Sequence, residues 1–88
     1  MTAARIDMIR TRLSKEFSPR ELEVIDDSHL HAGHDGAKDG RGHFRVRIVA
    51  EQFRGATPIQ RHRMIFNALG TLMETDIHAL SIAASAPD

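Results

Sequence analysis

The chain has 88 residues and zero net charge, which argues against non-specific nucleic-acid binding, because that binding depends on neutralising phosphates. A chain of this length forms one domain with a modest core. It contains six histidines and no cysteine, so it cannot by itself build a disulfide framework, a thiolate zinc site or a cysteinyl iron–sulfur site.

A helix and a short strand are predicted at the start of the chain. Over residues 1–17, four apolar residues recur at helical spacing, namely Ile6, Ile9, Leu13 and Phe17. Pro19 ends this helix, because the residue before a proline disfavours helical backbone. Residues 22–26 then alternate in the manner of a strand, with Leu22 and Val24 on one side and Glu23 on the other.

A long connection rich in glycine and histidine follows over residues 28–42. Loops of about 15 residues without periodicity are usually functional or disordered, and we expect residues 32–42 to be mobile in the free protein. The segment contains His29, His31 and His34, and His43 follows it directly. Imidazole is the commonest metal ligand among side chains, so this group either binds metal or belongs to a solvated segment.

Residues 43–50 form the clearest predicted strand. Their alternation places Phe44, Val46 and Ile48 on one face and Arg45 and Arg47 on the other.

A turn at residues 53–56 leads into a second helix. Thr57 is suited to the N-cap position and Pro58 to the first helical position. The helix is expected to reach about Leu72 and to loosen at Gly70, with an alternative in which it breaks in two near Gln60. The remaining elements are a turn at residues 73–76, a strand at residues 77–84 and a flexible tail at residues 83–88.

The element order α-β-β-α-β predicts an α+β sandwich. The first two strands are consecutive and are expected to pair antiparallel, whereas a right-handed crossover through the second helix places the last two strands parallel and adjacent. The result is a three-stranded mixed sheet with helices on one face, within a single domain over residues 1–88. Because no apolar run approaches the roughly 18–20 residues that cross a bilayer, we expect a cytoplasmic protein.

His78 opens the final strand, and its alternation places it on the side of Leu80 and Ile82. On the residues alone, a histidine there is typically a structural residue at the rim of the core. A zinc site made only of histidines is an alternative for His78 and the histidines of the connection.

The sequence contains no recognisable set of catalytic residues, so we do not expect an enzyme.

The basic residues suggest a second kind of site. Arg61, His62 and Arg63 begin the second helix, where cations are slightly unfavourable, and they could form a binding surface with other arginines. Those arginines are Arg45, Arg47 and Arg54. The neighbouring strand carries the acidic residues Glu21, Glu23 and Asp27, and we expect pairing with Arg45 and Arg47 to prevail over phosphate binding.

Several blocks of the sequence resemble the BolA family. They are Phe53-x-Gly55, Gln60-Arg61-His62-Arg63-x-Ile65 and Ile77-His78-Ala79-Leu80-Ser81-Ile82, together with Asp27-Ser28-x-x-His31 and His43-Phe44-Arg45-Val46. The resemblance extends from Ile6 to Ile82 and implies a fold like the class II KH domain, in agreement with the predicted order of elements.

The resemblance also implies a partner and a cofactor. The partner is a monothiol glutaredoxin, with which a [2Fe–2S] cluster is shared and which brings glutathione. The family's cluster-linked histidines fall on His78 and His31, with His29 and His34 as alternates. No cofactor is expected in the isolated protein, which would be a monomer or weak dimer.

Some members of the BolA family are described as transcriptional regulators, and the resemblance therefore also implies an alternative role. In this alternative the protein binds DNA through Arg61, His62 and Arg63, with Arg45 and Arg47 as further candidates.

Overall fold

The computed structural model describes residues 2–27 and 42–88. The expectations for residues 28–41, including the mobility of the connection, lie outside the described residues. The elements are α1 (Thr2–Phe17), β1 (Glu21–Asp26), β2 (Gly42–Val49), the 3-10 turn η2 (Glu51–Phe53), α3 (Pro58–Leu69), α4 (Leu72–Thr75) and β3 (Ile77–Ser85). In the part of the chain so described, no helix combines the length and the apolar character that crossing a membrane requires.

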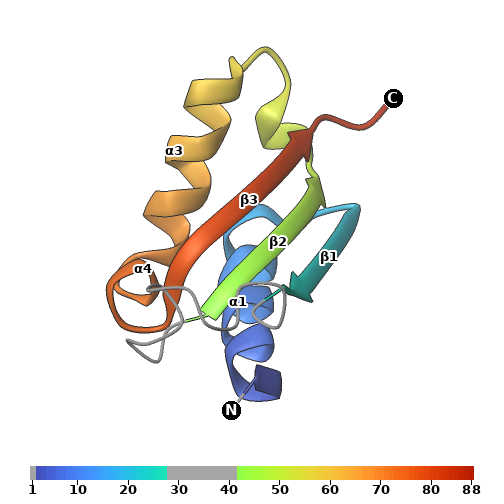
Figure 1. The fold of residues 1–88 in the computed structure, drawn as a ribbon. Helices are drawn as coiled ribbons and strands as arrows, with labels where there is room; N and C mark the ends of the chain where they lie inside the picture. Colours follow the sequence, from blue (N-terminus) through green and yellow to red (C-terminus); the bar gives the residue numbers. More distant parts are fainter. Residues whose placement is uncertain (1, 28–41) are drawn as a thin grey trace.

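The three strands form one mixed sheet in the order β1-β2-β3 (Figure 1). β1 pairs antiparallel with β2, and β2 pairs parallel with β3. The predicted α+β fold and strand arrangement are confirmed. The helices pack on the face that carries Val46 and Ile48, which are buried, and the opposite face, which carries the exposed Arg45, is turned toward the viewer.

One hydrophobic core joins the helices to the sheet. α1 contributes Ile9, Leu13 and Phe17, as its apolar spacing predicts, and each of these side chains is buried. The other core residues are Val24, Phe44, Val46, Ile48, Ala50, Phe53, Ile65, Leu69, Leu72 and Ile77. Phe53, in the short turn after β2, packs its ring 5.0 Å from the ring of Phe17. This contact fixes the end of α1 against the segment that leads into α3.

α3 begins as the sequence predicts. The Thr57 hydroxyl accepts the backbone N–H of Gln60 at 3.1 Å, and the Gln60 side chain accepts the Thr57 N–H at 2.9 Å. This reciprocal pair is a capping box, with Pro58 at the first position. The alternative break near Gln60 is therefore wrong, because Gln60 stabilises the helix start.

The end of α3 differs from the expectation. The helix stops at Leu69 rather than Leu72, and a separate turn, α4, occupies Leu72–Thr75. The cause is Gly70, which has a positive φ of 55° and donates its N–H to the Phe66 carbonyl at 2.9 Å. A residue without Cβ adopts this conformation at the least cost, so the helix ends there.

Two smaller expectations also need correction. β3 continues through Ser85, whose carbonyl accepts the Ala50 N–H at 3.0 Å, so residues 83–85 are not part of a tail. Gly42 is the first residue of β2 rather than the end of the connection. On α3, Phe66 is 39% exposed, and the centroid of its ring lies 6.3 Å from that of the His62 ring.

The capping box gives a first prediction. Thr57→Ala removes the acceptor for the Gln60 N–H and should lower the free energy of unfolding by about 1 kcal/mol. Thr57→Ser keeps the hydroxyl and should stay within a few tenths of a kcal/mol. Urea denaturation followed by circular dichroism measures both. Equal losses in the two variants would mean that the hydrogen bond contributes nothing.

Candidate functional site

The histidines predicted to bind metal divide into two groups. His29, His31 and His34 lie outside the described residues, so the structure neither brings them to His78 nor separates them from it. His78 is the second residue of β3 and is exposed. The sequence predicted a position at the rim of the core, whereas the side chain is more accessible than those of Leu80 and Ile82, which are half-buried.

An irregularity in the sheet lies at His78. Gly42 pairs with Ile77, but the next residue of β2, His43, pairs with Ala79. His78 is therefore the extra residue of β3 at this step. Bulges of this kind commonly re-aim a side chain next to a functional site.

The irregular register brings a second histidine to His78. The ring centroids of His43 and His78 are 5.1 Å apart, with 48° between the ring planes. His43 is only 9% exposed. From the sequence, His43 was predicted to open this strand and belonged to the group of histidines that could bind metal, but it was not singled out as a ligand. The sequence feature that points to His43 is its spacing: His43, Arg45 and Arg47 lie two residues apart, which places all three on one face of β2.

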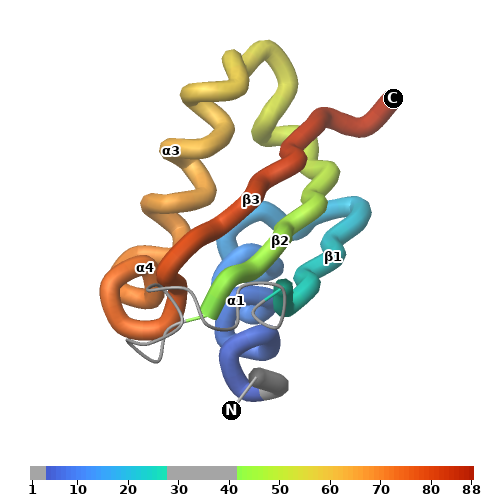
Figure 2. The backbone as a smooth tube through the Cα atoms, viewed as in Figure 1, coloured from blue at the N-terminus to red at the C-terminus, as the bar shows by residue number. Residues whose placement is uncertain are grey.

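The ends of the undescribed segment meet at the same place. Asp27 donates its backbone N–H to the His43 carbonyl at 2.8 Å, and Gly42 donates to the Asp76 carbonyl at 3.0 Å. The end of β1 and the beginnings of β2 and β3 thus lie at one end of the sheet (Figure 2). A hollow of about 230 Å³ is lined there by Asp27, His43, Phe44, Ala79, Leu80 and Ser81.

Two imidazoles are a partial metal site. Within residues 2–27 and 42–88, no group of three or more His, Cys, Asp and Glu side chains is arranged to hold a metal ion. Neutral imidazoles suit zinc, copper, nickel and iron. Of the two, His78 is the exposed imidazole, and any further ligands of a metal bound to it would come from residues 28–41 or from another molecule.

The arginines of β2 are engaged by acidic residues, as expected. Arg45 Nη2 lies 3.0 Å from the Asp27 carboxylate, and Arg47 Nη1 lies 3.2 Å from the Glu21 carboxylate. Both pairs link β1 to β2 on the uncovered face of the sheet. The predicted pairing of the two arginines with acidic residues is therefore present, and a phosphate would have to compete with these carboxylates.

The basic residues of α3 differ in how far they are engaged within the protein. Arg61 is half-buried, and its Nη1 donates to the Ala84 carbonyl of β3 at 2.8 Å. Its neighbours His62 and Arg63 are exposed. Arg54, in the turn before α3, also has a partner within the protein. Its guanidinium hydrogen-bonds to Glu51 and lowers the pKa of that carboxyl below its ordinary value.

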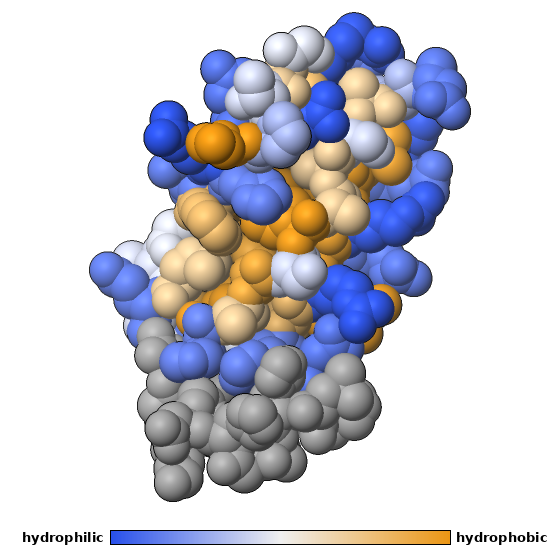
Figure 3. All heavy atoms as spheres, turned by 45° about the horizontal axis from the view of Figure 1, so that its top comes forward, coloured by the Kyte–Doolittle hydropathy of each residue, from blue (hydrophilic) through white to orange (hydrophobic). Residues whose placement is uncertain are grey.

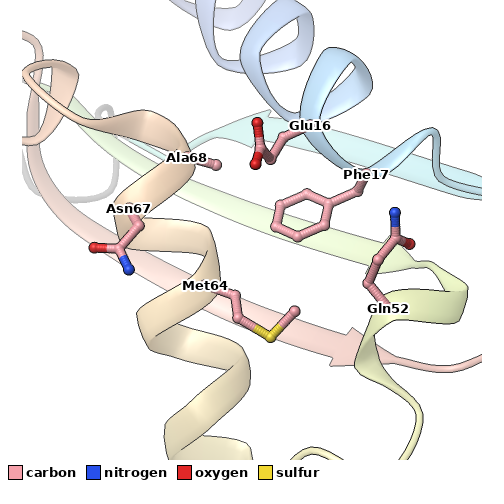
Figure 4. A pocket seen from close by; sticks show the side chains of 6 residues that line it. All are labelled: Glu16, Phe17, Gln52, Met64, Asn67 and Ala68. Atoms are coloured by element: carbon pink, nitrogen blue, oxygen red, sulfur yellow. The ribbon is translucent and has the colours of Figure 1, made fainter.

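A separate hollow lies between the end of α1, η2 and α3 (Figure 4). It has a volume of about 380 Å³ and is lined by Glu16, Phe17, Gln52, Met64, Asn67 and Ala68. Phe17 and Met64 give it an apolar surface, and Glu16 is the one titratable side chain in this lining. One carboxylate without a base or nucleophile beside it is not an arrangement for catalysis.

Known proteins resemble the chain over most of its length. SufE-like protein 1, chloroplastic/mitochondrial, of Arabidopsis thaliana is 44% identical over 84 residues, which are 90% of this chain and 23% of that protein. Protein BOLA1, chloroplastic, of the same plant is 41% identical over 94% of this chain and 54% of its own length. The chain thus spans a quarter to about half of these two relatives.

A bacterial relative and a solved structure complete the comparison. The DNA-binding transcriptional regulator BolA of Vibrio cholerae is 40% identical over 86% of this chain and 69% of its own length. The BolA domain of SufE1 from Arabidopsis thaliana superimposes with a TM-score of 0.84 and 44% identity, covering 96% of this chain and 93% of that one. The description of the BolA-like protein family matches residues 13–88. With this match and a fold shared with BolA domains, the chain belongs to the BolA family.

Proposed function

We propose that the protein is an iron–sulfur adaptor that binds a monothiol glutaredoxin and shares a [2Fe–2S] cluster with it through histidine ligands. The observation that supports this role most directly is the exposed imidazole of His78, held at the end of the sheet beside a second imidazole. Membership of the BolA family supports the same proposal.

The chain connectivity supports His31 as a second ligand. His31 follows Asp27 by four residues, which span at most about 14 Å of extended chain. Asp27 is hydrogen-bonded to the backbone of His43, and the His43 ring is 5.1 Å from the His78 ring. The chain between Asp27 and His31 is therefore long enough for His31 to reach His78. His29 and His34 are near enough in sequence to serve as alternates.

The chemistry of the donors fits a shared cluster. When bound, the cluster would supply one-electron redox chemistry and a transferable iron–sulfur unit. Because the chain has no Cys, its own donors are neutral imidazoles, and the thiolates must come from the glutaredoxin cysteine and glutathione. Imidazole must be deprotonated to bind iron, so acidification should weaken the complex.

The surface beside the histidines suits a protein partner. β3 contains no Asp, Glu, Lys or Arg. An apolar band runs across this side of the molecule in the direction of β3, with hydrophilic residues along its flank (Figure 3). The centres of protein interfaces are depleted in charged residues.

We place this role in the cytoplasm, where a chain without cysteine suits the reducing conditions.

The complex itself is the primary test. The protein is mixed anaerobically with a cluster-loaded monothiol glutaredoxin, and visible circular dichroism and size exclusion are recorded. We expect a changed visible spectrum and a heterocomplex. An unchanged spectrum together with separate elution of the two proteins would contradict the proposed function.

The histidines should differ in importance. His78→Ala should abolish the altered spectrum while leaving the apo fold intact, because the strand fixes the position of this ligand. His31→Ala should reduce the spectral change only in part, because His29 or His34 can substitute. Replacing His29, His31 and His34 together by Ala should reduce it further. His62→Ala is the control, because His62 lies on α3 and should have no effect. Unfolding of apo His78→Ala would instead indicate a structural role.

DNA binding is a second candidate function. The Vibrio cholerae relative is named a DNA-binding transcriptional regulator, and His62 and Arg63 are exposed side by side on α3. The engagement of Arg61, Arg45 and Arg47 within the protein reduces the positive charge that remains for phosphates.

This candidate predicts a salt-dependent affinity for DNA. If Arg63 contacts a phosphate, Arg63→Ala should reduce the slope of log affinity against log salt by about 1, whereas Arg47→Ala should leave it unchanged. Fluorescence anisotropy with promoter and random duplexes measures both variants. Equal binding to the two duplexes at about 150 mM salt would exclude a sequence-specific regulator.

A further inference from the structure

We propose that the outer edge of β3 receives an extended segment of a partner protein, which adds to the sheet as a fourth strand beside α3. The segment is apolar in its middle and acidic at its ends. This inference goes beyond the proposed function and does not rest on it. The glutaredoxin contact is proposed near His78 at the beginning of β3, whereas the groove described below lies near Ala84, at the opposite end of the strand.

The hydrogen bonds of β3 show which of its backbone groups face outward. β3 is the last strand in the order β1-β2-β3, so one of its two edges has no neighbouring strand in the sheet. The Ser85 carbonyl faces β2, because it accepts the Ala50 N–H at 3.0 Å. Backbone groups of successive residues point to opposite edges of a strand. The N–H and C=O groups of Leu80, Ile82 and Ala84 therefore face outward.

Arg61 occupies one end of this outer edge. Its Nη1 donates to the Ala84 carbonyl at 2.8 Å, which agrees with an outward-facing Ala84. The outward N–H and C=O groups of Leu80 and Ile82 have no hydrogen-bond partner among the described residues. These two residues therefore offer both donors and acceptors to an added strand, and main-chain hydrogen bonds of this kind supply the affinity when a peptide extends a sheet.

β3 also lacks the features that usually prevent a strand edge from pairing. Exposed edges are commonly protected by Lys, Pro, inward-pointing charges or bulges. The strand Ile77–Ser85 contains no Pro and no Asp, Glu, Lys or Arg. Its irregular step lies at its beginning, and its register with β2 is regular from Ala79 to Ser85. An added strand can therefore pair over Leu80 and Ile82 without meeting a charge or a bulge.

α3 provides an apolar wall beside this edge. It runs alongside β3 (Figure 1), and a hollow of about 180 Å³ lies between the two elements. On α3, Ile59 is 65% exposed and Phe66 is 39% exposed, and residues seven apart share a helix face. Alternate side chains of an added strand point toward the helix layer, where they can cover this apolar face. The hollow is lined by Pro58, Arg61, His62, Ile82, Ala83 and Ala84.

The charge of the groove selects the chemistry of the occupant. α3 contains Arg61 and Arg63 but no Asp or Glu, and Arg63 is exposed. A second copy of this chain that paired through its own β3 would bring its own basic α3 to the groove. Like charges that face each other across an interface are unfavourable. A segment with acidic residues on either side of an apolar middle instead complements both the basic helix and the uncharged strand.

Hydrogen exchange in the free protein tests the edge itself. We expect the N–H groups of Leu80 and Ile82 to exchange rapidly, and those of Ser81 and Ala83, which face β2, to be protected. Protection of Leu80 and Ile82 at every protein concentration would mean that another part of the chain covers the edge. Protection that appears only as the concentration rises would identify a second copy as the occupant. Either result would overturn the proposal.

Synthetic peptides test the occupant. Two peptides share the core Val-Thr-Ile-Thr-Val, and one carries two Glu at each end where the other carries two Lys. We expect the Glu peptide to protect the Leu80 and Ile82 N–H groups and to bind at least about tenfold more tightly than the Lys peptide. N-methylation of the core amides should abolish binding, because the ladder cannot form. No binding of the Glu peptide at millimolar concentration, or equal binding of the Glu and Lys peptides, would contradict the proposal.

Matched surface variants locate the groove. Arg63→Glu should weaken binding of the Glu peptide at least about fivefold, whereas Arg10→Glu, the same change of charge on α1, should weaken it less than about twofold. Ile59→Ser should weaken binding in the same way, with Met8→Ser on α1 as its control. All four side chains are exposed, so the fold should persist, and urea denaturation checks this. Equal effects within each pair would show that the peptide does not lie along α3.

Discussion

The parallel pairing of β2 with β3 is the constraint on which the rest of the structure depends. It adds the third strand to the sheet after a helical crossover. It also forms one buried face, where Val46 and Ile82 pair, which packs against α1 and α3. The same pairing brings His43 and His78 together from distant parts of the sequence. Its irregular step at Gly42 and His43 is therefore both a feature of the sheet and the origin of the candidate site.

Ion pairs engage several arginines on the surface of the described residues. Arg45 pairs with Asp27 and Arg47 with Glu21 across two neighbouring strands, while Arg54 pairs with Glu51 within one turn. Exposed pairs of this kind contribute little to stability. Their larger effect is on binding, because each guanidinium already has a carboxylate partner. A nucleic acid would have to displace these carboxylates before its phosphates could contact the arginines.

The sequence predicted the elements whose signals are local. Leu13 and Phe17 follow helical spacing, and Thr57 with Pro58 marks a helix start, so each could be identified from a few neighbouring residues. The end of α3 was harder, because the apolar spacing continues to Leu72 and only the backbone shows that the helix ends at Gly70. β3 extends to Ser85 because β2 supplies a hydrogen-bond partner, the Ala50 N–H, which no pattern within β3 reveals.

The role of His43 could not be predicted for a related reason. Alternation gives the face of each residue on its own strand, and it separated His43 from His78 by placing them on opposite faces. The contact depends on a one-residue shift between two strands, and such a shift reverses the face of a side chain. A chain without cysteine has no thiolate of its own, so imidazole is its donor for metals that prefer nitrogen or sulfur. The result is a buried imidazole on the central strand that packs against an exposed imidazole on an edge strand, so His78 is the one of the two that a partner protein can reach.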